Sequence, residues 1–275
     1  MLISYDMTNA EYHARPELSR SHVHRFKGRL GGKTQSFVQR GGTVFAGNAS
    51  TDLGTNLDTA FGATVEKRTL DSVFVVPPAG VLATDGSRRG KAYTEWKSSL
   101  PAGAAEVSAA TRKQIDDMIA SILEHDRARE LIEQTTSTQT SVFWTDADGF
   151  DRKARADGTT RELWYDLKTT ASEWRDVYKS FIRFGYHWQA AWYTEAAIAS
   201  GYEKHFRMPF IVVQTFAPYM VEVFTLPDRL VEQAAREIRE TLFEMRRRIE
   251  TGKYLPDDYG QERELHFPEY VYSAE

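Results

Sequence analysis

The patterning of the chain changes from helical to extended in its middle, and this change constrains the fold most. Apolar residues recur every three or four positions over 108–124, which predicts an amphipathic helix with Ser108 as its cap. Two extended runs at 140–145 and 150–157 then flank the sequence Asp-Ala-Asp-Gly, which is typical of a hairpin turn. A third extended run follows at 163–168. This order predicts an α/β fold in which helices flank a central mixed sheet.

The remaining predicted elements lie on both sides of this block. Further helices are expected at 19–26, 53–67, 172–184, 186–200 and 228–251. Further strands are expected at 72–76, 208–216 and 221–226. We interpret residues 1–275 as a single domain, in which 1–50 form a basic N-terminal extension lining a DNA channel and 227–275 form a C-terminal helix and tail.

The chain contains no Cys, which excludes several kinds of site. Disulfides, thiolate nucleophiles, cysteine-ligated zinc and iron-sulfur clusters all require that residue. Any metal must therefore use oxygen or imidazole ligands. The longest apolar run, at 208–213, is far shorter than the roughly 18 residues of a membrane span. Because the first residues also lack the pattern of a signal peptide, we expect a cytoplasmic protein with no membrane contact.

Positive charge gathers in three places, although the formal net charge is -4. Residues 18–51 contain basic side chains but no Asp or Glu, and a glycine-flanked loop and a helix after the third strand are also basic. Local clusters of this kind can hold a polyanion whatever the net charge of the protein. A solvated surface is the alternative interpretation. The candidate DNA contacts are Arg25, Lys27, Arg88, Arg89, Arg175, Lys179 and Arg183.

Two acids and a lysine are predicted to converge on neighbouring strands. A period of two places Arg155 and Asp157 on one face of the second hairpin strand, and Asp166 and Lys168 on one face of the third. Pairing of these strands would bring two carboxylates and an ammonium group together. Hard oxygen ligands suit magnesium, and a metal-bound water beside a lysine can attack a phosphodiester. The sequence therefore predicts phosphodiester hydrolysis, with Arg155 contacting a phosphate or pairing with an acid.

The acid-x-lysine triplet carries little information by itself. Glu95, Trp96 and Lys97 match the pattern of Asp166 to Lys168, but no strand ending in Asp precedes them. The context of Asp166 is therefore what favours it.

Six segments between about residues 7 and 226 occur in an informative order. They are MTNAEYH at 7–13, LDTAFGATVE at 57–66, SVFWTD at 141–146, ARAD at 154–157, YDLKTT at 165–170 and YHWQAAWY at 186–193. In this order they resemble the RecE-type, exonuclease VIII-like branch of the PD-(D/E)XK nuclease superfamily. The resemblance implies a magnesium-dependent exodeoxyribonuclease that degrades linear double-stranded DNA from its ends, 5′ to 3′ and without ATP, in recombination.

The resemblance also implies partners and residue roles. Manganese is expected to substitute for magnesium, the protein is expected to form a homo-oligomer, and a single-strand annealing protein is the expected partner. The metal-binding acids are Asp157 and Asp166, the backbone carbonyl of Leu167 is a further ligand, Lys168 is the catalytic lysine, and Gln189 and Tyr193 match a Gln-x-x-x-Tyr pair of related nucleases.

Two departures from the family pattern point to a weaker metal site. Gly62 stands where the family usually has a histidine, and Gln139 stands where it has a glutamate. An amide keeps an oxygen ligand but lacks the negative charge, so metal affinity should fall. Asp58, one helical turn before Gly62, is a candidate replacement, with a surface or capping Asp as the alternative. A non-catalytic DNA-binding or assembly subunit, or a nuclease for other DNA ends, therefore stays open.

Overall fold

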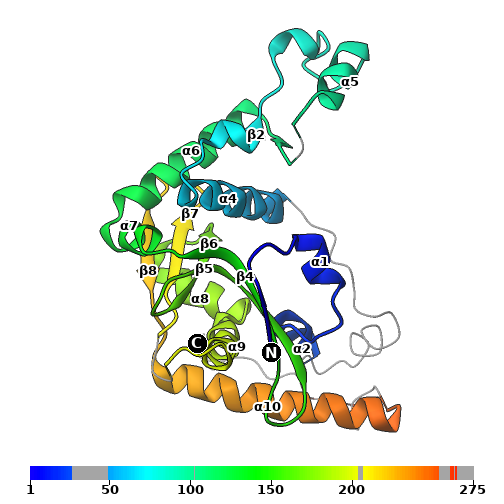
Figure 1. Cartoon of the computed structure of the whole chain (residues 1–275), viewed down its shortest axis with the longest axis vertical. Helices are drawn as coiled ribbons and strands as arrows, with labels where there is room; N and C mark the ends of the chain where they lie inside the picture. Colours follow the sequence, from blue (N-terminus) through cyan, green and yellow to red (C-terminus); the bar gives the residue numbers. More distant parts are fainter. Residues whose placement is uncertain (27–48, 102, 204–206, 254–260, 263, 265–275) are drawn as a thin grey trace, which may run out of the picture.

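The computed structural model describes residues 1–26, 49–101, 103–203, 207–253, 261–262 and 264, and its centre is a six-stranded sheet (Figure 1). In spatial order the strands are β1 (Leu2–Ser4), β4 (Ser137–Thr145), β5 (Asp151–Thr159), β6 (Trp164–Thr170), β7 (Phe210–Gln214) and β8 (Val221–Phe224). Strands β6 and β7 pair in parallel, and the other neighbours pair antiparallel. The predicted mixed α/β fold is therefore confirmed.

The predicted hairpin joins β4 and β5. The carboxylate of Asp146 accepts hydrogen bonds from the backbone N–H groups of Asp148 and Phe150, at 3.0 and 2.9 Å. Gly149 adopts a φ of 78°, a left-handed conformation that glycine reaches without a steric penalty. The turn therefore follows directly from the Asp-Ala-Asp-Gly sequence.

Helices cover both faces of the sheet. The helices of the described residues are α1 (Asn9–Ala14), α2 (Arg20–Phe26), α4 (Ala49–Val65), α5 (Lys91–Ser98), α6 (Ala109–Glu124), α7 (Asp126–Glu133), α8 (Val177–Arg183), α9 (Tyr186–Ala199) and α10 (Asp228–Thr251), of which α5 lies away from the sheet. Because β6 and β7 are parallel, the chain must cross from one end of the sheet to the other between them, and α8 and α9 make this connection.

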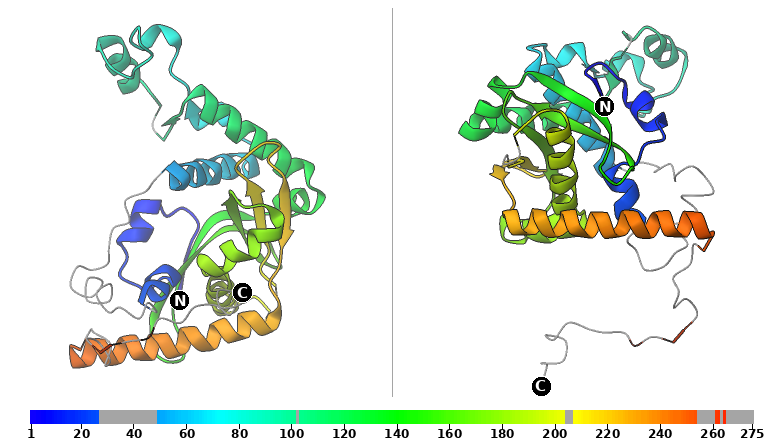
Figure 2. Two further views of the ribbon diagram at one scale, coloured as in Figure 1. Left: turned by 180° about the vertical axis from the view of Figure 1, so that it is seen from behind. Right: turned by 60° about the horizontal axis from the view of Figure 1, so that its bottom comes forward.

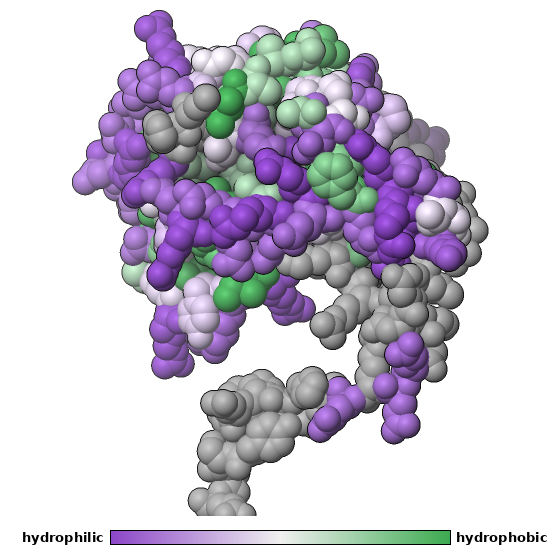
Figure 3. Space-filling view, turned by 90° about the horizontal axis from the view of Figure 1, so that it is seen from below, coloured by the Kyte–Doolittle hydropathy of each residue, from purple (hydrophilic) through white to green (hydrophobic). Residues whose placement is uncertain are grey.

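One face of the sheet packs against α4, α6 and α7. Its core includes Phe61 from α4, Met118 from α6 and Leu131 from α7, and these side chains meet Tyr165 and Leu167 of β6. On the opposite face, α9 and α10 lie side by side beneath the sheet (Figure 2). The molecular face covered by α10 is mostly hydrophilic (Figure 3), as its many charged residues require. No helix in the described ranges has the length and apolar character to cross a membrane.

Several elements differ from their sequence predictions. The expected strand at 72–76 is reduced to β2 (Phe74–Val75), which pairs with β3 (Ala105–Glu106) in a separate two-stranded sheet. The expected helix at 172–184 starts only at Val177, after a 3-10 turn at Trp174–Asp176. Helices α1, α5 and α7 and strands β1 and β3 have no counterpart among the predicted elements. Helix α5 belongs to an arm that projects away from the sheet (Figure 1).

The N-terminal segment is bound to the sheet by buried cations of β5. Lys153, almost fully buried, donates hydrogen bonds to the backbone carbonyls of Tyr12 and Arg15, at 2.8 and 2.6 Å. The guanidinium of Arg155 donates to the carbonyl of Met7. These bonds place α1 against the sheet, where β1 extends it beside β4. Part of the predicted basic extension therefore packs on the core, whereas residues 27–48 lie outside the described residues.

Gly158→Ala is expected to destabilise the protein by about 3 kcal/mol, at the upper end of the usual cost of overpacking a core. Gly158 lies opposite Tyr165 in the β5–β6 pairing, and a Cβ on it would lie 2.1 Å from the Tyr165 ring. That ring cannot move aside, because its hydroxyl bonds Thr135 at 2.5 Å and its edge meets Phe61. Urea denaturation followed by circular dichroism measures the loss.

Gly54→Ala is the matched control. Gly54 lies within α4, and a Cβ there meets no atom within 4 Å, so alanine should raise stability by about 1 kcal/mol. Equal urea concentrations at the midpoint of unfolding for Gly158→Ala and wild type would show that the Tyr165 ring does not lie over Gly158.

Candidate functional site

Strands β5 and β6 separate at one end, and the candidate site lies where they part. Their backbone pairing joins Thr159 to Trp164 and Gly158 to Tyr165. The next pair in this register would be Asp157 and Asp166. There, the backbone N–H of Leu167 instead donates to Asp157 Oδ2, at 2.8 Å. The carboxylate of Asp157 therefore occupies the position of a backbone acceptor, and the two acids lie at the opening between the strands.

Asp157 is held by partners from both neighbouring strands. Besides the bond from Leu167, its Oδ1 accepts a hydrogen bond from Gln139 Nε2 of β4, at 3.2 Å. Gln139 has a φ of 52°, a left-handed conformation that is uncommon for a residue with a side chain. Its carbonyl accepts a bond from Arg155 Nε, at 3.3 Å. The bend in β4 at Gln139 therefore directs both polar groups of this residue towards β5.

Asp166 is held from a strand and from a helix. Its side chain is 2% exposed and forms an ion pair with Lys168 through Oδ2. Its Oδ1 accepts a hydrogen bond from Gln189 Nε2 of α9, at 2.5 Å. Lys168 Nζ also lies 3.5 Å from the carbonyl of Leu167 and 5.2 Å from the centre of the Tyr186 ring. The structure therefore brings Asp157, Leu167, Asp166, Lys168 and Gln189 into one group.

The charges of this group influence each other strongly. Burial raises the pKa of Asp157 well above its usual range, and the charges of Asp166 and Asp58 raise it further. Burial by itself would lower the pKa of Lys168, but the charges of Asp166 and Asp157 outweigh burial and raise it. If all are ionised, three carboxylates face one ammonium group. The site therefore favours an additional cation.

Asp58 interacts electrostatically with this group, and its place inside a helix excludes the alternative of a capping residue. It lies in the middle of α4 and is partly buried. Burial raises its pKa to about 7, the charge of Lys168 lowers it and that of Asp166 raises it. Gly62 instead lies near β4, because a Cβ there would be 4.0 Å from the hydroxyl of Thr138. Asp58, rather than position 62, is therefore the residue through which α4 acts on the acids.

In the absence of metal, we expect wild-type protein to lose stability as the pH rises, and we expect Asp58→Asn to be free of the part of this loss that Asp58 causes. A folded-state pKa of about 7, against an ordinary 3.8, means that the folded protein binds this proton more tightly than the unfolded chain does. The free energy of unfolding should therefore fall as the pH rises from about 4 to about 7, by up to roughly 1.4 kcal/mol per pH unit. Urea denaturation in EDTA at several pH values measures this slope.

The variant should match wild type near pH 4 and become progressively more stable than wild type towards pH 8. Asp52→Asn, at an exposed position in the first turn of the same helix, is the control and should follow wild type throughout. Identical slopes for wild type and Asp58→Asn would show that Asp58 does not interact with the acids.

Tyr193 and Arg155 hold the backbone around the acids. The hydroxyl of Tyr193 donates to the carbonyl of Arg155, at 2.7 Å, and one helical face thus contributes both Gln189 and Tyr193 to the site. Burial raises the pKa of Tyr193 well above its usual range. Arg155 bonds the carbonyls of Gln139 and Met7, while its Nη1 is buried and has no hydrogen-bond partner among the described residues.

The candidate DNA contacts differ in their surroundings. Arg175, Lys179 and Arg183 are exposed along α8 and the turn before it, and Asp176 pairs with the first two. Arg88 pairs with Glu106, and Arg89 pairs with Asp85, in the projecting arm. These pairs offset the charge predicted for that loop. The side chain of Arg25 and the whole of Lys27 lie outside the described residues.

Oxygen atoms dominate the possible metal ligands. In the part of the chain that the structure describes, no three His, Asp or Glu side chains are grouped so as to hold a metal by themselves. A cation would therefore need other oxygens besides the two acids. The carbonyl of Leu167 lies beside them, and the buried Oε1 of Gln189 has no hydrogen-bond partner in the described structure. This set fits a hard divalent cation such as magnesium, which retains part of its water shell.

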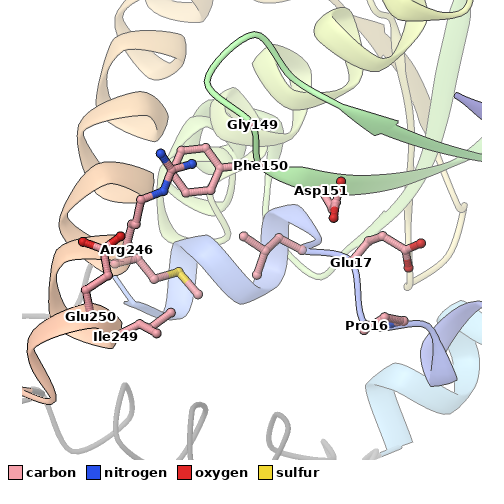
Figure 4. A pocket seen from close by; sticks show the side chains of 10 residues that line it. Pro16, Glu17, Gly149, Phe150, Asp151, Arg246, Ile249 and Glu250 are labelled. Atoms are coloured by element: carbon pink, nitrogen blue, oxygen red, sulfur yellow. The ribbon is translucent and has the colours of Figure 1, made fainter.

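A hollow of about 500 Å³ lies elsewhere, between the N-terminal segment, the β4–β5 turn and α10 (Figure 4). The guanidinium of Arg246 stacks there on the ring of Phe150, with 3.7 Å between its Cζ and the ring centre. Glu17 and Asp151 lie on the opposite side. Because none of the acids of the β5–β6 opening lines it, this hollow is separate from the candidate site.

Tyr186 is a further residue of the site that the sequence did not single out. Its ring lies beneath the ammonium of Lys168, and burial raises its pKa. The available signal was its position directly after Gly185, which has a φ of 67° and ends one helix before the next begins. This position marks Tyr186 as the first residue of a helix, and the structure adds that its side chain points towards β6.

Comparison with known proteins supports the fold. The profile of a family described as a PDDEXK-like domain of unknown function (DUF3799) matches residues 88–262. A crystal structure described as a "Putative exonuclease" from Eubacterium rectale is similar, with a TM-score of 0.60 and 15% sequence identity. The similarity covers 98% of this chain and 99% of that chain, and at this identity it shows the fold alone. No curated protein matches the chain in sequence.

Proposed function

Because the chain belongs to the PDDEXK-like family DUF3799, within the PD-(D/E)XK superfamily, we propose that it is a metal-dependent exodeoxyribonuclease. Its substrate is linear double-stranded DNA, which it degrades from the ends, 5′ to 3′ and without ATP. Magnesium is the cofactor, and manganese substitutes for it. The enzyme is of the RecE type, works as a homo-oligomer, and acts in recombination beside a single-strand annealing protein.

One observation carries this proposal: Asp157, Asp166 and Lys168 meet at the opening between β5 and β6. The three residues come from two strands, and Gln139, Gln189 and the backbone of Leu167 orient the two acids. Two carboxylates with one lysine suit a phosphodiester, because the acids can hold a cation while the lysine meets the negative charge of the phosphate.

Each residue has a separate task in the proposed mechanism. Asp157, Asp166 and the carbonyl of Leu167 would hold magnesium, with Gln139 and Asp58 adding an amide oxygen and negative charge. When bound, magnesium supplies a Lewis acid for the scissile phosphate and a water of lowered pKa. Lys168 leaves Asp166 to stabilise the charge that develops on the phosphate.

Other residues keep this arrangement in place. Gln189 fixes Asp166, and Tyr193 fixes the backbone of β5 through the carbonyl of Arg155. Arg155 would contact a neighbouring phosphate through its unpaired Nη1 once the N-terminal segment that covers it moves aside. The exposed cations Arg175, Lys179 and Arg183 lie along α8 and the turn before it, and they would contact the DNA backbone.

A second candidate is a DNA-binding or assembly subunit without catalysis. It is favoured by Gln139, whose amide donates a hydrogen bond to Asp157, an acid that we propose as a metal ligand. This subunit would bind DNA and leave it intact in magnesium and manganese.

Digestion of three DNA forms tests the proposed activity. Linear duplexes labelled at the 5′ or the 3′ end and a covalently closed circle are incubated with magnesium but no ATP. We expect the 5′ label to be released first as mononucleotide, while the circle stays intact. Cleavage of the circle would indicate an endonuclease, early release of the 3′ label would reverse the polarity, and binding without cleavage would favour the second candidate.

A further inference from the structure

Helix α8 and the residue that caps it expose three large apolar side chains, which we call the ridge. Tyr178, Ile182 and Phe184 are 55%, 63% and 48% exposed, although large apolar side chains usually lie inside a protein. Val177 and Phe181 of the same helix are buried, and Phe184 lies towards their side of the helix, whereas Tyr178 and Ile182 lie one turn apart on its outer side. The helix is therefore already packed through Val177 and Phe181, and the described structure does not cover the three side chains of the ridge.

A chain of contacts links this ridge to Lys168. The ammonium of Lys168 lies 5.2 Å from the centre of the Tyr186 ring, and the Tyr186 ring lies 5.9 Å from that of Phe184, tilted by 30°. Arg183 lies beyond, with its Cζ 5.5 Å from the centre of the Phe184 ring. Phe184 is therefore exposed to solvent and is connected through the Tyr186 ring to Lys168, the lysine that we place at the scissile phosphate.

The backbone of Phe184 is held firmly. Its carbonyl accepts a hydrogen bond from Arg20 Nη1, at 3.0 Å. The following residue, Gly185, has a φ of 67°, and a Cβ there would lie 2.6 Å from the ring of His24. Helix α2 thus presses closely on the turn that carries Phe184. A ring with a fixed backbone loses little conformational entropy when a flat partner stacks on it.

We infer that the ridge of Tyr178, Ile182 and Phe184 receives the terminal bases of the DNA after they unpair. This inference rests on the proposed function and specifies how the substrate enters. Opening a terminal base pair exposes the flat face of a base, and an exposed aromatic ring can replace the lost stacking. Phe184 is the residue nearest to Lys168, so it receives the base next to the phosphate that is cut.

Charge favours nucleic acid over a second copy of the chain. Exposed cations flank the ridge at Arg175, Lys179 and Arg183, and Asp176 offsets part of that charge. Alternating rings and cations match the bases and phosphates of a single strand. Two copies that met through this ridge would bring like charges together, which opposes association.

Digestion rates of two duplexes test the inference. One duplex has fully paired ends, and the other has mismatched, already open terminal pairs. Phe184→Ala should slow digestion of the paired end about tenfold. The variant loses the stacking of a base on the ring, and the free energy of one such stack corresponds to a rate change of about this size. It should slow the open end less, because no pair needs to be opened. Phe184→Trp keeps a stacking surface and should retain the wild-type rate on both.

A binding measurement separates this inference from the proposed activity. A 2-aminopurine at the terminal position is quenched when it stacks, and Lys168→Ala provides a background in which the DNA should stay intact. Quenching should occur in Lys168→Ala and be lost when Phe184→Ala is added. If wild type degrades no DNA, the proposed activity fails, while this quenching still decides whether the ridge receives bases.

Two controls complete the design. Phe243→Ala removes a comparably exposed ring from α10, beside the β4–β5 turn, and should change neither rate nor quenching. Ile182→Ala removes part of the ridge without touching Phe184 and should slow the paired end by a few fold. Unchanged rates and quenching in Phe184→Ala would overturn the inference. A smaller particle size for Phe184→Ala than for wild type, measured by light scattering, would also overturn it, because the ridge would then be an interface between copies of the chain.

Discussion

Asp157→Asn is expected to abolish DNA cleavage and, at the same time, to stabilise the metal-free protein. The charged form of Asp157 is unfavourable because the side chain is buried beside Asp166 and Asp58. An amide of the same shape can still accept the bond from the backbone of Leu167, while Gln139 can turn its amide to match. Removing the charge should raise the free energy of unfolding at about pH 8, because the folded protein no longer holds an unfavourable buried charge.

Activity should change in the opposite direction. Without the carboxylate of Asp157, the site loses one of its two principal anionic ligands, and cleavage should fall by roughly a thousandfold or more. Asp151→Asn is the matched control, because Asp151 is an exposed acid at the start of the same strand. It should leave cleavage and stability close to wild type. An Asp157→Asn protein that cleaves DNA normally, or that unfolds at lower urea than wild type, would contradict the proposed site.

Lys168→Ala is expected to abolish cleavage and to retain metal binding. Lys168 forms an ion pair with Asp166, so a cation and the lysine compete for the same carboxylate. Removing the lysine should therefore leave the affinity for manganese equal or higher, as measured by titration calorimetry. Cleavage should fall by about a hundredfold to a thousandfold, because the charge on the phosphate is no longer stabilised.

The sequence contains its own control for this variant. Lys97 follows Glu95 and Trp96 in the same acid-x-lysine pattern, but it lies on α5 and pairs with Glu106. Lys97→Ala should leave both cleavage and metal binding unchanged. Wild-type cleavage by Lys168→Ala would remove the lysine from the mechanism, and loss of metal binding would show that Lys168 maintains the structure of the site.

The elements with a clear period were predictable from the sequence. The helix at Ala109–Glu124 begins directly after its predicted cap, Ser108, and its buried positions are the apolar ones of the pattern. The hairpin follows from Asp146 and Gly149. Helix α7 was missed because His125 alone separates it from α6, so no loop-like stretch marks a second helix.

The site was predictable only in part. The alternation of residues along one strand predicts which side chains share a face, but it does not predict where that strand pairs with its neighbour. Alternation correctly placed Arg155 with Asp157 and Asp166 with Lys168. It could not show that the β5–β6 pairing stops at Gly158 and that the backbone of Leu167 then binds a side chain. Similarly, Asp58 and Gly62 are one helical turn apart, and only the packing of α4 decides which of them meets the acids.

The most direct test of the site is release of nucleotides from an end-labelled linear duplex in magnesium, manganese or EDTA. Wild type should release label with either metal and none in EDTA, and Asp166→Asn should release none under any condition. A folded wild-type protein that binds the duplex but releases nothing with either metal would contradict the site that we place between β5 and β6. Equal release in EDTA would contradict it as well.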